Sequence, residues 1–225
     1  MNAIPPSPPP LSGRRAEAAR NDARILDAAR EVFVADPGAP IAAVAERAGV
    51  GVASLYRRYP SKEHLLQRLF LESNRRGLAE TEAALADDGD PWEVFSRYMH
   101  RRLDAGEGAL SLNIPVTFAV TEEHRALMRT AHDLMQRLVD RTKAAGSLRP
   151  DVEVGDIGWL FVPLQAIESG DPIRNRELRH RHLAILLDGL RTGTTAPLPG
   201  PPPGWDEFGE IWEDVIPVTP AAKRT

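Results

Sequence analysis

Apolar residues recur every three or four positions along most of the chain, which is the spacing of helices that bury one side. This pattern predicts a helix over about residues 17–35 and a longer one from Ser61 to about Leu85. One later helix is predicted to start at Asp90, and another runs from Thr121 to about Ala145. Two more are predicted over the strongly apolar residues 153–169 and from about Arg174 to Arg191. No segment has the alternating pattern typical of a strand, so the sequence predicts an all-α fold.

Local signals mark several of these helix ends. Ser61, Asp90 and Thr121 have side chains that can accept a hydrogen bond from the backbone at a helix start. We expect Gly146 to stop the helix that precedes it, because glycine readily adopts the left-handed conformation of a helix end. Pro163 is expected to kink the apolar helix that contains it.

Two short helices between residues 41 and 59 carry the most functional information. The first, over 41–48, is expected to end at Gly49 in a left-handed turn. The second begins at Val52, and helical spacing turns Val52, Leu55 and Tyr59 inward. The residues that face outward or to the flanks are Ala53, Ser54, Tyr56, Arg57 and Arg58. Two short helices joined by a tight turn predict a helix-turn-helix motif.

The motif resembles the DNA-binding segment of the tetracycline-repressor (TetR) family, in which a recognition helix is followed by Ser-Lys-Glu and a long connecting helix. The residues that agree in type and spacing are Val50, Leu55, Tyr56, Pro60, Ser61, Lys62, Glu63 and Leu65. Three positions depart from the family: Gly51 stands at a usual Ser or Thr cap, Ala53 replaces a frequent Gly, and Arg58 replaces His or Tyr. The resemblance implies an N-terminal three-helix helix-turn-helix DNA-binding domain and a C-terminal helical ligand-binding and dimerisation domain.

The resemblance also implies which side chains meet DNA. Tyr56 and Lys62 match positions that contact phosphate, and we expect Arg58 to do the same. The positions nearest the base edges are Val52, Ala53, Ser54 and Arg57. Since two of these offer only methyl contacts, sequence readout by side chains is expected to be modest. Arg14 and Arg15 are either additional phosphate or minor-groove contacts or simply the solvated start of a helix.

Composition divides the chain into four parts. We expect a disordered Pro-rich arm over 1–16, the DNA-binding domain over 17–62, the ligand-binding and dimerisation domain over 63–192, and a Pro-rich linker with an acidic amphipathic tail over 193–225. Residues 1–62 hold nine Lys and Arg against six Asp and Glu, whereas the remainder holds nineteen against twenty-six. Attraction for DNA phosphate is therefore expected at the N-terminal end.

The composition also argues against several classes of protein. No run approaches the roughly 18 consecutive apolar residues of a membrane span. The N-terminus lacks the basic and then apolar segments of a secretory signal. The chain has no cysteine, so it has neither a disulfide nor a thiolate metal site. We therefore expect a cytoplasmic protein without a membrane partner or a cofactor.

The C-terminal helices are expected to hold a small-molecule effector between them. Candidate pocket residues are Trp92, Phe95, Tyr98, Met99, Phe118, Met128, His132, Met135, Trp159 and Pro163. In the family the last two helices pair with those of a second subunit; the matching apolar residues are Trp159, Leu160, Leu164, Ile167, Leu183, Leu186, Leu187 and Leu190. The alternative is that both helices are buried within one chain. The resemblance implies a homodimeric repressor that a small molecule releases from a palindromic DNA operator.

Other functions stay open. One is a DNA-binding regulator without a ligand, and another is a helix-turn-helix that contacts only protein. A helical metal-dependent enzyme is suggested by the Glu-x-x-His spacing of Glu177 and His180. A di-metal site needs a second such pair, which the sequence lacks, and there is neither a nucleophile elbow nor a phosphate loop. We therefore expect no enzymatic activity and no metal site.

Residues 205–216 are an acidic amphipathic segment. Its apolar residues are Trp205, Phe208, Ile211, Trp212 and Val215, and its acidic residues are Asp206, Glu207, Glu210, Glu213 and Asp214. Such a segment is either disordered or docks on an apolar surface of the ligand domain, in its own or the partner subunit.

Overall fold

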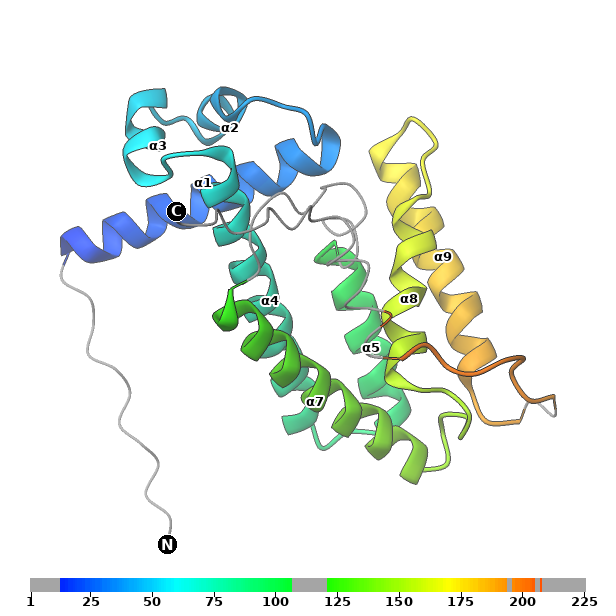
Figure 1. Ribbon diagram of the computed structural model, residues 1–225. Helices are drawn as coiled ribbons and strands as arrows, with labels where there is room; N and C mark the ends of the chain where they lie inside the picture. The colour runs from blue at the N-terminus through cyan, green and yellow to red at the C-terminus, as the bar shows by residue number, and fades with distance from the viewer. Residues whose placement is uncertain (1–12, 107–120, 194–195, 205–206, 208–225) are drawn as a thin grey trace, which may run out of the picture.

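The computed structural model describes residues 13–106, 121–193, 196–204 and 207. Its helices form two bodies joined by one long helix (Figure 1). Within the described residues the regular structure is helical, apart from an isolated antiparallel bridge between Leu148 and Arg191. The predicted all-α fold is confirmed for this part of the chain.

The first body consists of α1 (Gly13–Ala35), α2 (Ile41–Ala48) and α3 (Val52–Arg58). α1 begins four residues before the predicted start, because the Arg, Ala and Glu residues after Gly13 are good helix formers. The last part of the predicted disordered arm is therefore helical, and residues 1–12 lie outside the described residues. Gly49 has a φ of 65° and ends α2 as predicted. The core of this body includes Ile25, Leu26, Ala29, Phe33, Val44, Ala45, Leu55 and Tyr59.

α4 (Lys62–Ala86) connects the two bodies. Ser61 accepts the backbone N–H of His64 at 3.4 Å and caps the helix as predicted. The first half of α4 contributes Leu65 and Leu69 to the first core, whereas Ala84 near its end lies in the second core. Because one helix is packed into both cores, a movement of α4 in one body also displaces its other end.

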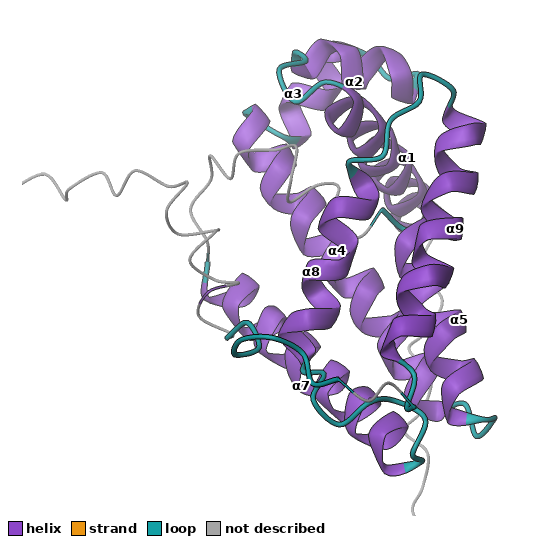
Figure 2. Ribbon diagram, turned by 90° about the vertical axis from the view of Figure 1, so that its right-hand side faces the viewer, coloured by secondary structure: helices purple, strands orange, loops and turns teal. Residues whose placement is uncertain are grey.

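The second body contains α5 (Pro91–Asp104), α7 (Glu122–Ala144), α8 (Val154–Gln165) and α9 (Pro172–Leu190). Asp90 caps α5 and Thr121 caps α7, as predicted. α8 contains Pro163 and ends two residues later, short of the predicted end at 169. α8 and α9 pack against each other along one side of the molecule (Figures 1 and 2).

One apolar core fills the second body. It combines α5, α8 and α9 through Trp92, Phe95, Tyr98, Met99, Ile157, Phe161, Leu164, Leu183, Leu187 and Leu190. Arg141 of α7 donates to the carbonyl groups of Ala84, Leu85 and Asp87, so the C-terminal end of α4 is satisfied by hydrogen bonds. No helix among the described residues is both long and apolar enough to span a membrane.

The chain after α9 returns to the second body. Arg149 N–H donates to the Leu190 carbonyl at 3.0 Å, and Thr192 N–H donates to the Ser147 carbonyl at 3.2 Å. Residues 196–204, orange in Figure 1, then lie against the loop between α7 and α8. The predicted linker is therefore a docked segment over these residues.

Candidate DNA-binding surface

α3 presents a short exposed face. Ala53, Ser54 and Arg57 are exposed as predicted, and Tyr56 is 46% exposed. The predicted inward position of Val52 is wrong, since 43% of this residue is exposed. Val52 is the first residue of a helix of only seven residues and lies at the edge of the core. We call Val52, Ala53, Ser54, Tyr56 and Arg57 the exposed face of α3.

Two buried side chains attach α3 to the first core. Leu55 has no exposed surface and Tyr59 is buried, as predicted. Gly51 is the N-cap and provides no side-chain hydrogen bond, although its carbonyl accepts the N–H groups of Ser54 and Leu55. A helix of this length is not stable by itself. The structure and position of α3 therefore depend on its contacts with other helices.

Asp22 of α1 holds the C-terminal end of α3. Arg58 Nε donates to Asp22 Oδ1 at 2.6 Å, the Tyr59 hydroxyl donates to the same oxygen, and Arg68 Nη2 lies 4.0 Å from Asp22 Oδ2. Burial alone would raise the pKa of Asp22, but the hydrogen bonds from Arg58 and Tyr59 outweigh burial and lower it. Burial and the bond to Asp22 raise the pKa of Tyr59 to about 12, so the hydroxyl stays protonated. The structure gives Arg58 a positioning role through Nε, while the predicted phosphate contact, for which its other N–H donors remain, stays a prediction.

Lys62 is half-buried beneath the turn between α1 and α2. Its ammonium group donates to the carbonyl groups of Pro37 at 2.7 Å and Ala39 at 2.8 Å, and it lies 4.8 Å from the centre of the Phe33 ring. An ammonium group has three donors, so one is left for the predicted phosphate contact, which stays a prediction. Lys62 thus fixes the turn between α1 and α2 to the start of α4.

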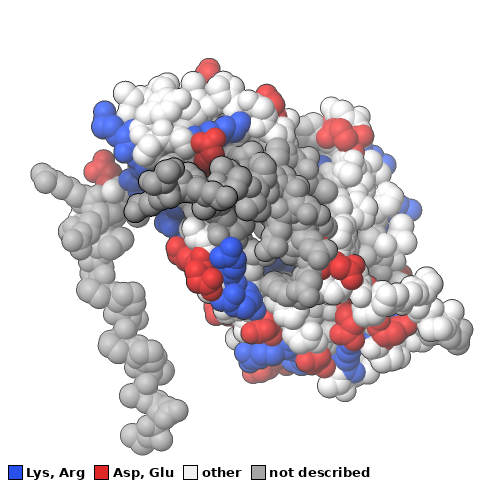
Figure 3. All heavy atoms as spheres, in the orientation of Figure 1, with Lys and Arg blue, Asp and Glu red and all other residues white. Residues whose placement is uncertain are grey.

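The remaining predicted DNA contacts are Arg14 and Arg15. Both lie in the first turn of α1, and the positions of their side chains are outside the described part of the structure. On the face shown in Figure 3, basic side chains over the first body are interspersed with acidic ones. The charge over the first body is therefore not a uniform positive patch on this side.

Family comparisons identify both bodies. Residues 25–69 match the family "Bacterial regulatory proteins, tetR family", and residues 87–192 match "Transcriptional regulator SbtR-like, C-terminal domain". The chain belongs to the TetR family. It is accordingly a helix-turn-helix DNA-binding transcriptional regulator.

Individual TetR-family relatives cover most of the chain. The HTH-type transcriptional repressor LfrR of Mycolicibacterium smegmatis is 26% identical over 192 residues, which are 83% of this chain and 95% of LfrR. A TetR transcription regulatory protein from Mycobacterium vanbaalenii is 28% identical with a TM-score of 0.57, covering 80% of this chain and 99% of that one. The structure of LfrR from Mycobacterium smegmatis in complex with proflavine matches with a TM-score of 0.54 and 22% sequence identity. The match covers 75% of this chain and 96% of the LfrR chain.

The predicted pocket residues of this TetR-family chain are only partly brought together. Those inside the second core are Trp92, Phe95, Tyr98 and Met99. Those half-buried on α7 are Met128, His132 and Met135. Trp159 and Pro163 lie on the outward side of α8, because Ile157 and Phe161 occupy its core side. Phe118 lies outside the described residues.

The predicted dimer contacts of α8 and α9 need correction. Leu164, Leu183, Leu187 and Leu190 are buried in the core of their own chain, so they are not available to a partner. The half-buried members of the predicted set are Trp159, Leu160, Ile167 and Leu186. The apolar side chains that do project outward include Ile173, which is 73% exposed, and Ile185, which is 60% exposed. The leucine pattern therefore marks the side of α9 that faces its own core.

The Glu-x-x-His pair on α9 is used in other contacts. Glu177 accepts from Arg174 at 2.8 Å. His180 Nε2 lies 2.8 Å from Asp104 Oδ1, and its Nδ1 lies 2.8 Å from Nδ1 of His100 in a stacked ring pair. Burial and the charge of His180 lower the pKa of His100, so one of the facing Nδ1 atoms donates while the other accepts. Among the described residues no group of three or more His, Asp or Glu side chains suits a metal ion.

Two contacts between the bodies had no signal in the sequence. Arg30 of α1 donates to the Ala105 carbonyl at 2.9 Å and to the Ser73 hydroxyl at 2.8 Å, which ties α1 to the end of α5 and to α4. His124 at the start of α7 is buried, with Nε2 3.3 Å from the Gln67 carbonyl of α4. These partners are separated by 43 to 75 residues, so no local pattern could have indicated them.

Proposed function

We propose that this regulator is a homodimer that binds a palindromic operator through two copies of α3 and leaves it when a small molecule binds the second body. The exposed face of α3 is the observation that carries this proposal. Arg57 on that face has no ion-pair partner within the described part of the chain, although charged side chains nearby are paired. A free guanidinium group on an exposed recognition helix is suited to a base edge or a phosphate.

Each side chain of the exposed face has a distinct role in this proposal. Val52 and Ala53 offer methyl contacts, as to thymine, whereas Ser54 and Arg57 hydrogen-bond to base edges. Tyr56 and the remaining donor of Lys62 contact phosphate and set the register on DNA. Because the two α3 helices of a dimer meet successive major grooves, about 34 Å apart, the operator is an inverted repeat.

The second subunit is proposed to pack on the outward sides of α8 and α9. Exposed Ile173 and Ile185 supply apolar surface there, with exposed Pro163 at the end of α8. Isolated exposed isoleucines in a monomer leave apolar surface in water, which a two-fold interface would bury. A DNA-binding dimer of this kind is expected to work in the cytoplasm, beside the chromosome.

The effector is proposed to be a small aromatic molecule. The structure of LfrR is described as a complex with proflavine, and the second body of this chain is rich in buried aromatic residues. A ligand that favours one arrangement of α5 and α7 would bias the first body through Arg30 and His124, which hold these helices to α1 and α4. The ligand can shift the free-energy difference between the two arrangements only by the difference in its binding free energy to them.

DNA binding is tested with duplex fragments that the purified protein retains from a random library. Arg57→Ala is expected to weaken binding to the retained sequence by about tenfold, and the urea midpoint should not change because Arg57 is exposed. Arg181→Ala, which removes an exposed arginine from α9, is the matched control and should bind as the wild type does. Equal losses in both variants, or none in Arg57→Ala, would refute a direct role for the exposed face of α3.

One observation favours a regulator that needs no effector. Phe95, Tyr98 and Met99 have no exposed surface and are packed in the second core. A thermal-shift screen with aromatic cations, proflavine among them, separates the two functions. A compound that raises the melting temperature and releases the selected DNA supports the effector proposal; if every compound leaves DNA affinity unchanged, the constitutive regulator is the better account.

A further inference from the structure

Two histidines join α5 to α9 through a chain of hydrogen bonds. His100 Nδ1 lies 2.8 Å from His180 Nδ1, and the planes of the two rings differ by 6°. His180 Nε2 in turn lies 2.8 Å from Asp104 Oδ1, and Arg176 Nε donates to the same oxygen at 3.0 Å. His100 and Asp104 belong to α5, whereas His180 and Arg176 belong to α9. Every bond of the chain therefore crosses between the two helices.

This geometry limits how many protons the pair can hold. The Asp104 carboxylate only accepts, so Nε2 of His180 carries a proton. One further proton lies between the two Nδ1 atoms, where one donates and the other accepts. A single imidazolium ion on either ring keeps this arrangement, because the Nδ1 of the opposite ring can stay unprotonated. If both rings are imidazolium ions, two N–H donors face each other and the bond is lost.

The charges around the pair also oppose a second imidazolium ion. Burial and the charge of His180 lower the pKa of His100, and the charge of Asp104 only partly compensates. Asp104 is shared with Arg176, so a doubly protonated pair would place three positive groups around one carboxylate. Further charged or titratable groups on the surrounding helices have partners of their own. These are Glu80 of α4 with Arg101, His132 of α7 with Asp133, Arg141 of α7 with carbonyl groups of α4, Asp156 of α8 with the Glu153 N–H, Glu177 of α9 with Arg174, and Arg179 of α9 with the carbonyl groups of Gln165 and Ile167.

His124 of α7 shows why two facing rings behave differently from one. Its Nδ1 lies 2.7 Å from the Thr121 hydroxyl, and its Nε2 lies 3.3 Å from the Gln67 carbonyl. A hydroxyl can accept as well as donate, so an imidazolium ion at His124 keeps both contacts. An opposite imidazole ring lacks this freedom once it is itself protonated.

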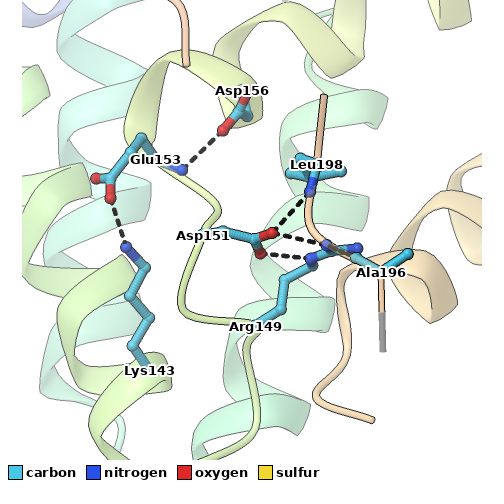
Figure 4. Close-up of polar contacts among 7 residues, drawn as sticks. All are labelled: Lys143, Arg149, Asp151, Glu153, Asp156, Ala196 and Leu198. Carbon is cyan, nitrogen blue, oxygen red and sulfur yellow. Dashed lines mark hydrogen bonds and ion pairs between the residues drawn. The ribbon is translucent and has the colours of Figure 1, made fainter. Parts of the chain in front are cut away.

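Residues 196–204 are held by groups that do not titrate between about pH 5 and 8, where histidine does. Arg149 donates to both carboxylate oxygens of Asp151, at 2.6 and 2.7 Å, and to the Ala196 carbonyl at 2.9 Å (Figure 4). The bonds from Arg149 and the Leu198 N–H hold the pKa of Asp151 far below its usual range, so the carboxylate stays ionised. Mild acid therefore leaves these contacts intact.

The end of α5 that carries Asp104 is also held by the first body. The carbonyl of the next residue, Ala105, accepts a hydrogen bond from Arg30 of α1 at 2.9 Å, and Arg30 also donates to the Ser73 hydroxyl of α4. α9 and α1 therefore hold adjacent residues of the chain. If α5 separates from α9, the carbonyl that Arg30 contacts is no longer held in place from the α9 side.

We propose that the His100–His180 pair is an acid-sensitive contact between α5 and α9, and that its loss lowers the affinity of α3 for DNA. In acid, a second proton breaks the bond between the facing Nδ1 atoms, and the end of α5 moves away from α9. The first body then samples additional orientations, so fewer chains hold α3 as DNA requires. The effect on DNA rests on the proposed function, whereas the acid-sensitive contact does not.

Urea unfolding tests the contact without DNA. His100→Asn replaces the ring with an amide that does not titrate and can face His180 with either its N–H or its oxygen. His182→Asn is the matched control, because it removes an exposed histidine from α9. Since the pKa of His100 is lowered in the folded chain, its stabilisation is present above the unfolded pKa of about 6.5 and is lost as pH falls below that value.

Wild type is therefore expected to lose stability in acid more steeply than His100→Asn. Between pH 7.5 and pH 5.5 its unfolding equilibrium constant should rise about three- to tenfold more, where tenfold is the limit for one excluded proton with an unfolded pKa of about 6.5. His182→Asn should follow wild type. A smaller difference between wild type and His100→Asn, or an equal loss of the pH effect in His182→Asn, would overturn the acid-sensitive contact.

The effect on DNA is measured with the selected duplex at pH 7.5 and pH 5.5 and at constant salt. Acid should weaken binding by wild type and by His182→Asn at least about threefold more than binding by His100→Asn. Equal changes in all three proteins would overturn the effect on DNA. If none of them binds the duplex at pH 7.5, the proposed function fails and the effect on DNA fails with it, while the urea result still decides the acid-sensitive contact.

Discussion

Replacing Asp22 with Asn tests how α3 is held in place. The variant keeps the shape of the side chain but removes the charge that accepts from Arg58 and Tyr59. A hydrogen bond to a charged group contributes about 1.5–3 kcal/mol when shielded from water. The Arg58 side chain is 39% exposed, so water competes with its bond, whereas Asp22 and Tyr59 are largely buried. Since Asn retains one accepting oxygen, we expect a loss of about 1–2 kcal/mol.

The loss of folding stability in Asp22→Asn should depend on pH in a defined direction. Because the pKa of Asp22 is lowered in the folded chain, its stabilisation is present above the unfolded pKa of about 3.9 and is lost as pH falls through the folded pKa. Urea unfolding of wild type and Asp22→Asn should therefore differ by the same amount at pH 7 and pH 5. The difference should narrow below about pH 4.

A matched control separates this effect from a general loss of charge on α1. Asp27→Asn removes a carboxylate from the same helix, but Asp27 pairs with Arg76 in an exposed ion pair and is expected to contribute less than about 1 kcal/mol. Affinity for the selected DNA should fall in Asp22→Asn and not in Asp27→Asn, because only the first loosens α3. Equal urea midpoints for Asp22→Asn and wild type at pH 7 would refute the reasoning.

Two further substitutions test contacts that hold each body together. Lys62→Met removes the bonds to the carbonyl groups of Pro37 and Ala39 and should lower the free energy of unfolding by about 1–3 kcal/mol. Urea unfolding should show a lower midpoint with an unchanged slope. An unchanged midpoint would show that Lys62 does not stabilise the fold and acts only in DNA binding. Tyr98→Phe removes a buried hydrogen bond of 3.1 Å to Thr81 and should cost about 1 kcal/mol without altering the helical content. A Tyr98→Phe variant as stable as wild type would contradict that estimate.

The sequence predicted a helix end accurately where a capping residue marked it, whereas the start of α1 and the end of α8 were misplaced by four residues. Asp90 and Thr121 cap helices because each side chain bonds to a backbone N–H three residues later, so the whole interaction lies within one short segment. Gly49 ends α2 for a similarly local reason. The helix-turn-helix was therefore predictable from one stretch of the chain.

The roles of single charged residues were not predictable in this way. Arg58 bonds to a residue 36 positions away, and Lys62 bonds to carbonyl groups 23 and 25 positions away. A side chain can contact DNA only through donors that are not already bonded within the protein. These internal bonds form only when α1 packs on α3 and α4, so the sequence of one segment does not reveal them. The periodicity of α9 was ambiguous for a related reason, because a leucine stripe does not reveal whether its own core or a partner covers it.

The central claim is that two copies of α3 bind one inverted repeat of duplex DNA. The most direct measurement is the mass of the complex between the full chain and a selected duplex, with wild type and Arg57→Ala compared. The account predicts two chains on each duplex, an enriched sequence with two half-sites about one helical turn apart, and weaker binding by Arg57→Ala. One chain bound to a sequence without a repeat, or equal binding by both proteins, would contradict it.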